Sequence, residues 1–158
     1  MALENPRVKF YDILDTFKQQ IVSLIENEQL ELDPIDRKAH LAKIDRLYRT
    51  LLLIKSTNSL LAITFFHQYL FVPYGVQIMN QDEDFFLNHR HQILEGNDLG
   101  LTDLIEGVSM VYPRLDEINR KIIWKYVLAL CKTADLALGQ DLFERLKLEK
   151  QANLTKQS

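Results

Sequence analysis

The sequence has few glycines and prolines, one cysteine and little net charge. Five glycines and four prolines among 158 residues are too few for a β-sandwich, which needs a turn about every 8–12 residues. The single cysteine excludes an internal disulfide framework and is typical of a reducing compartment. The formal net charge of −3 differs from the strong basic excess of general nucleic-acid-binding proteins. Together these absences favour a helical protein and give no support to general nucleic-acid binding.

The hydrophobic pattern predicts an all-α fold. Apolar residues make up 47% of the chain, which is enough for one packed core. They recur at helical spacing over about 6–28, 34–55, 58–71, 102–112, 115–138 and 141–151. We expect a single helical domain over residues 1–152, built as a bundle of five to six helices, and a disordered polar tail over 153–158. The segment 115–138 is apolar on nearly all sides, so we expect it to be the central buried helix.

Proline and glycine predict where several helices end. The residue before Pro73 avoids the α region, so the helix over 58–71 is expected to stop there. Gly139 is a natural C-terminal breaker of the 115–138 helix. Residues 80–100 show poor periodicity, and we expect them to be irregular or partly helical.

The sequence contains no arrangement typical of an enzyme active site, and we expect no enzymatic activity, no cofactor and no metal. A zinc site needs three or four converging ligands, whereas His89 and His91 lie two residues apart without a paired-cysteine motif. Cys131 lies in the most apolar predicted helix, where burial should raise the thiol pKa and lower its reactivity. There is also no glycine-rich phosphate-binding loop and no Ser-His-Asp arrangement.

Residues 82–87 combine acidic and large apolar side chains: Asp82, Glu83, Asp84, Phe85, Phe86 and Leu87. A calcium loop would need a glycine and a distal glutamate, so the acids fit better at a helix start, where they face the positive end of the dipole. The apolar residues either fill the core or form an exposed anchor for a partner protein. We take these six residues as the candidate partner-binding site.

Basic residues recur at helical spacing in two places. Lys43, Arg46 and Arg49 form one basic helix face, and a second group lies between Arg120 and Lys132. Most such faces are simply solvated, although they could contact phosphate or an acidic partner. Interleaved acids reduce the local field, and we do not expect nucleic acid to be the main partner.

Three motifs carry a resemblance to other proteins. They are Phe-His-Gln-Tyr-Leu-Phe-Val-Pro-Tyr at 66–74 followed by Gln77 and Ile78, Asp-Glu-Asp-Phe-Phe-Leu at 82–87, and Ile-Asn-Arg-Lys-Ile-Ile-Trp-Lys-Tyr-Val at 118–127. Over about residues 60–130 the chain resembles a set of uncharacterised helical proteins encoded by large double-stranded DNA viruses of algae and protists. The resemblance implies a viral origin and a structural, virion or host-interaction role, and it implies no particular activity.

We therefore predict a non-enzymatic protein–protein interaction or structural protein, virion-associated or host-interacting if it is viral. A protein partner is expected, and a homo-oligomer is open. One alternative is a Bcl-2-like bundle whose groove binds an amphipathic helix, although the chain has no Asn-Trp-Gly-Arg motif. Another is a nucleic-acid-associated accessory protein that uses the basic faces.

The expected location is intracellular and cytoplasmic. The N-terminal residues lack the basic-then-apolar profile of a signal peptide. The apolar stretch over 60–72 is too short to cross a bilayer, so no membrane span is expected.

Overall fold

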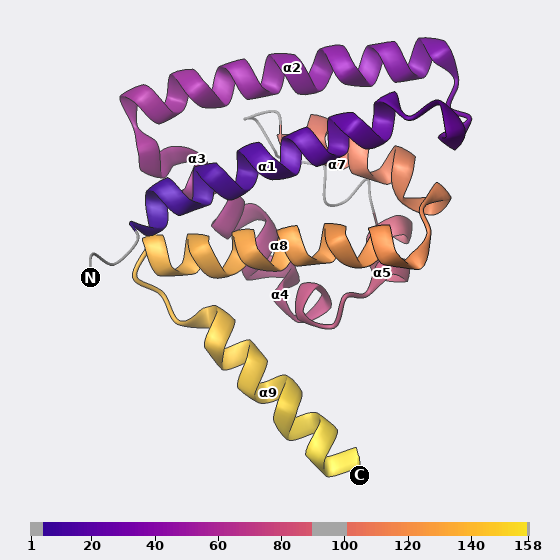
Figure 1. The fold of residues 1–158 in the computed structure, drawn as a ribbon. Helices are drawn as coiled ribbons and strands as arrows, with labels where there is room; N and C mark the ends of the chain where they lie inside the picture. Colours follow the sequence, from indigo (N-terminus) through magenta and orange to yellow (C-terminus); the bar gives the residue numbers. More distant parts are fainter. Residues whose placement is uncertain (1–4, 90–100, 158) are drawn as a thin grey trace.

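The computed structural model describes residues 5–89 and 101–157. These residues form helices and no β-strand, which confirms the all-α prediction. Helix α1 (Pro6–Glu26) and helix α2 (Pro34–Thr57) form an antiparallel hairpin, and helix α8 (Glu117–Ala137) runs antiparallel to α1 along its other side (Figure 1). Both hairpin helices begin with a capping side chain followed by proline, because an Asn or Asp oxygen satisfies the free N–H groups of the first turn.

Helix α1 presents the most continuous stripe of buried residues. It packs against α2, α3 (Ser59–Phe66), α7 (Leu101–Val111) and α8. Its buried side chains recur every three or four residues: Phe10, Tyr11, Leu14, Phe17, Ile21, Leu24 and Ile25. No single neighbouring helix covers the whole stripe, so several helices pack side by side along α1.

Helix α8 buries only one face, so the prediction of a helix buried on nearly all sides is wrong. Ile118 is 71% exposed and Leu136 is 57% exposed. The reason lies in Lys121, Lys125 and Lys132, which lie one and then two helical turns apart on the same side of α8 and remain exposed. Their charges keep this side of α8 in water although neighbouring positions are apolar. The opposite face contributes Ile123, Trp124, Leu130 and Cys131 to the core.

The helix that starts at Ser59 does not stop at Pro73. It passes through a π-helical turn, η2 (His67–Phe71), into α4 (Val72–Met79), and the backbone is kinked at Tyr74, whose φ of −119° and ψ of 18° are not helical. The Val72 N–H donates to the His67 carbonyl, five residues back instead of four. A wider π turn of this kind accommodates the proline ring and its missing N–H, so the helix continues through Val72 and Pro73, and the expected break comes at Tyr74, one residue after the proline.

A tight turn connects α4 to the short helix α5 (Glu83–Asn88). Gln81 adopts a left-handed φ of 51° in this turn, which reverses the chain direction. The sequence predicted an irregular or partly helical segment here, and α5 is its helical part. The remainder of that segment, and with it His91, lies outside the described residues. After α7, the 3₁₀ turn η3 (Tyr112–Arg114) leads into α8.

Helix α9 (Leu142–Gln157) extends away from the body of the protein (Figure 1). Gly139 precedes it with a φ of 68°, which confirms its predicted role in ending α8. The first half of α9 packs closely on α4, since a Cβ at Gly75 would lie 2.6 Å from Leu146 Cδ1. The predicted disordered tail is helical as far as Gln157, because residues 149–157 are mainly strong helix formers.

Candidate functional site

The three acids of residues 82–84 start helix α5. The Asp82 carboxylate accepts a hydrogen bond from the Phe85 N–H at 3.1 Å and so caps the helix. Glu83 and Asp84 follow in the first turn, where the helix dipole favours negative charge. This confirms the interpretation of the acids as a helix start. Asp82 and Asp84 remain exposed beside the apolar residues that follow them.

Arg120 fixes α5 to the rest of the protein. Its guanidinium lies 3.2 Å from the Glu83 carboxylate and also donates to the carbonyls of Tyr112 and Pro113, at 3.2 and 3.1 Å. The same group lies 5.0 Å from the centre of the Tyr112 ring. Arg120 therefore joins α5, η3 and α8, and it does not belong to a free basic face. Sequence reasoning missed this role because Glu83 lies 37 residues earlier in the chain.

Phe85, Phe86 and Leu87 face three different environments. Phe86 packs against the core, with its ring 5.7 Å from that of Trp124. Phe85 is half-buried and stacks on His89 at 4.4 Å. Leu87 is 41% exposed. The sequence left open whether these residues fill the core or form an exposed anchor. Phe86 packs in the core, and Leu87 is exposed to solvent.

Trp124 forms its polar contact with Tyr112. Its indole N–H donates to the Tyr112 hydroxyl at 2.8 Å, inside the core. Burial raises the pKa of Tyr112, while the indole hydrogen bond opposes that rise. The neighbouring Tyr126 instead stacks on Phe17 of α1 at 5.2 Å. These rings hold α8 against η3 and α1, directly behind α5.

An apolar cavity of about 160 Å³ lies beneath α5. Residues of α1, α3, η2, α4, α5, α7, η3 and α8 contribute to its walls. Its lining includes Phe65, Tyr69, Phe86, Leu87, Val108 and Val127. Tyr69 and Leu87 are also exposed, so the cavity reaches the surface where η2 and α5 meet.

The helix from Ser59 to Met79 carries no charged residue, and much of its apolar surface is exposed. Only 33% of its most apolar 18-residue window is buried within the protein. Its exposed apolar residues, which we call the apolar face, are Leu61, Tyr69, Val72 and Val76. By length and composition alone, this helix is long and apolar enough to cross a membrane, whereas the stretch 60–72 taken from the sequence was too short. Core helices of soluble proteins meet the same criterion.

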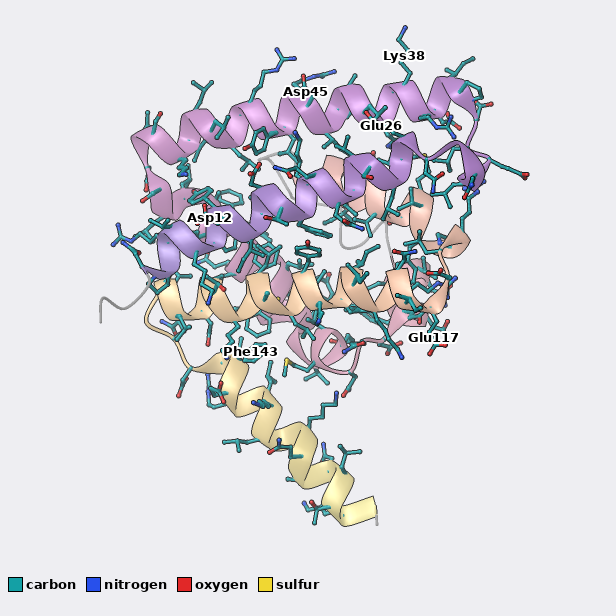
Figure 2. All side chains as sticks on the ribbon, viewed as in Figure 1. Asp12, Glu26, Lys38, Asp45, Glu117 and Phe143 are labelled. Carbon is teal, nitrogen blue, oxygen red and sulfur yellow. The ribbon has the colours of Figure 1, made fainter. Side chains whose placement is uncertain are left out.

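The predicted basic face on α2 is interrupted by acids. Lys43 lies 3.6 Å from Glu106 of α7. Arg49 pairs with Asp45 one turn earlier, and this pair lowers the pKa of Asp45. Figure 2 shows Asp45 and Lys38 together on the outer side of α2. Two of the three predicted basic residues therefore have acidic neighbours, and only Arg46 extends as an exposed cation with no acid described beside it.

A buried pair of His67 and Asp135 was missed by sequence reasoning. His67 Nε2 lies 2.9 Å from Asp135 Oδ1, and the other carboxylate oxygen accepts the Phe143 N–H at 3.0 Å. Asp135 thereby joins η2, the end of α8 and the start of α9, where Figure 2 places Phe143. The available signal was an aspartate in an otherwise apolar turn of a helix.

Other candidates for chemistry do not come together. Among the described residues there is no group of three or more side chains that could hold a metal ion. The Cys131 thiol is buried, and its pKa is raised first by burial and then by the charge of Asp135. A thiol in this environment is a poor nucleophile.

Comparison with protein-family models, with curated proteins and with solved structures returned no significant match. The resemblance to viral helical proteins therefore stays a prediction. What this chain does has to be inferred from its own geometry.

Proposed function

We propose that this protein is a non-enzymatic interaction protein that binds a partner protein at the surface around α5. The observation that supports this most is the exposure of Leu87 and Tyr69 at the mouth of an apolar cavity. We call this mouth, together with the exposed carboxylates of Asp82 and Asp84, the α5 surface. Large apolar side chains at the centre of an interface dominate its binding energy, and surrounding charges select the partner.

The α5 surface is held in place before any partner arrives. Arg120 bonds to Glu83 and to two carbonyls of η3, and Phe86 packs on Trp124. A short helix fixed in this way loses little conformational entropy on binding, which favours affinity. Such fixation would have little purpose in a merely solvated connection.

The chemistry of the surface points to a basic, amphipathic partner segment. The apolar face continues from Tyr69 along the charge-free helix to Val72 and Val76, which suits the apolar side of another helix. Exposed Asp82 and Asp84 at one end favour lysine or arginine on the partner. This combines the predicted interaction role with the groove-binding alternative. The acids beside Lys43 and Arg49 support a protein partner over nucleic acid.

The remaining parts of the proposal extend the sequence prediction. They are a single-domain bundle of five to six helices, an intracellular cytoplasmic location, and a structural or host-interacting role if the chain is viral. If the protein forms a homo-oligomer, the partner at the α5 surface is a second copy of the same chain.

The test compares surface variants with a matched control. A partner is captured from the native source, purified, and titrated by calorimetry against wild type, Leu87→Asp, Tyr69→Asp and Leu53→Asp. Leu53 is 70% exposed on α2, away from the α5 surface. We expect at least a tenfold loss of affinity for the first two variants and none for Leu53→Asp. If the Leu87→Asp and Tyr69→Asp variants are folded and bind as wild type does, the proposal is wrong. Sedimentation of the free protein measures its oligomeric state and so tests whether the partner is a second copy of the chain.

A further inference from the structure

We infer that the cavity beneath α5 is a binding site for a small, neutral, apolar molecule, about the size of one aromatic ring or a short alkyl chain. The inference concerns the cavity interior and does not rest on the proposed partner binding. Three observations carry it: the size of the cavity, the state of its polar groups and its opening at the surface.

The cavity has the volume of a one-ring ligand. It measures about 160 Å³, close to the roughly 150 Å³ of an engineered apolar cavity that binds benzene. Typical sites for drug-sized molecules are about 300–1,000 Å³, so larger ligands do not fit. The rings of Phe65, Phe86 and Trp124 line the cavity, and they provide edges and faces for an aromatic guest.

Most of the polar groups at the cavity wall already have partners within the protein. The Ser109 hydroxyl donates to the Ile105 carbonyl at 2.8 Å, and the Trp124 N–H donates to the Tyr112 hydroxyl at 2.8 Å. Glu83 is engaged by Arg120 at 3.2 Å. A bound water needs two to four polar partners, and a charged ligand needs a counter-charge. The groups of Ser109, Trp124 and Glu83 are already engaged and the rest of the wall is almost entirely apolar, so an apolar guest is favoured over water or a polar metabolite.

A ligand can reach the cavity from the surface. Tyr69 and Leu87 belong both to the lining and to the exposed surface. They mark an entrance between η2 and α5 that needs no unfolding of the core. The entrance is apolar, which again selects against charged molecules.

Binding is tested with purified full-length protein and defined probes: toluene, indole, n-hexanol and xenon. Methyl NMR follows the signals of Val108, Val127 and Ile123, with Leu154 on α9 as an internal control. We expect saturable shifts of the three lining residues and none of Leu154. At ten times its dissociation constant, a probe should raise the melting temperature by about 3–6 °C.

Cavity-filling variants locate the site. Val127→Phe should abolish the probe-induced shifts, and Ser109→Leu, a milder change whose loss is one hydrogen bond within its own helix, should weaken binding at least fivefold. Leu154→Phe, an exposed position, is the matched control and should bind as wild type does. Two results would overturn the inference: no probe shifts the lining methyl groups near its solubility limit, or the shifts persist in both filled variants. Neither result depends on a protein partner, so the proposed function is judged separately.

Discussion

Replacement of Asp135 is expected to cost more stability than replacement of any surface acid of this protein. Asp135 is 2% exposed, and its two oxygens serve His67 and the Phe143 N–H on two different elements. Asp135→Ala removes both bonds at once and leaves two polar groups without a partner in the interior. Asp135→Asn retains the shape and keeps an oxygen for Phe143, while its amide N–H₂ can donate to a neutral His67 ring.

The size of the effect follows from these contacts. Each buried group left without a partner costs about 1–3 kcal/mol, so Asp135→Ala should cost about 3–5 kcal/mol, as for other broken buried pairs. That is a large share of a typical total stability of about 5–15 kcal/mol. It corresponds to a fall in melting temperature of about 6–20 °C. Asp135→Asn loses only the charge-assisted part of the bonds, about 1–2 kcal/mol.

Urea unfolding followed by circular dichroism measures these differences, and amide hydrogen exchange of Phe143 reports the start of α9 directly. Asp45→Ala is the control, because Asp45 is an exposed acid inside α2 that pairs with Arg49 one turn away, and its loss should change stability by less than about 0.5 kcal/mol. A double-mutant cycle of Asp135→Asn with His67→Gln isolates the pair. An Asp135→Ala cost within about 1 kcal/mol of wild type, or a coupling below about 0.5 kcal/mol, would refute the reasoning.

Three further changes test other parts of the structure. Gly139→Ala should destabilise the protein by about 1 kcal/mol in chemical denaturation, because a side chain is strained at φ 68°; an unchanged midpoint would contradict the assigned turn. Arg120→Ala should lower the melting temperature and release α5, seen as faster amide exchange at Phe86, whereas Lys121→Ala, an exposed neighbour, should change neither. Burial raises the pKa of Cys131 above its ordinary value of 9.0. The protonated thiol therefore contributes its full stabilisation below pH 9, and the free energy of unfolding should decline as the pH rises above 9. Cys131→Ala should flatten this decline when urea unfolding is measured across that pH range.

Local chemistry let the sequence predict where several helices begin and end. Asp82 and Gly139 act on backbone groups at most a few residues away, so their effect hardly depends on the rest of the fold. The spacing of apolar residues likewise indicated an all-helical chain. The candidate segment 82–87 was found for the same reason, since its acids and aromatics are consecutive in the chain.

Only the tertiary structure decided which faces of those helices are buried. Apolar residues such as Ile118 and Leu136 look equivalent to core residues in the sequence, but α8 packs on α1 with its other face, which leaves them exposed on the side that carries the lysines. The passage of the helix through Pro73 depends on a π turn that local propensity does not predict.

The pairs that organise the site lie far apart in the chain. Arg120 meets Glu83 across 37 residues, and His67 meets Asp135 across 68. The cavity beneath α5 likewise requires walls from helices as far apart in the sequence as α1 and α8. The sequence by itself determined the helices and the residues at their ends, because these depend on neighbours within a turn. Packing decided the cavity, the exposed Leu87 and the buried pair of His67 and Asp135, because each exists only when distant segments meet.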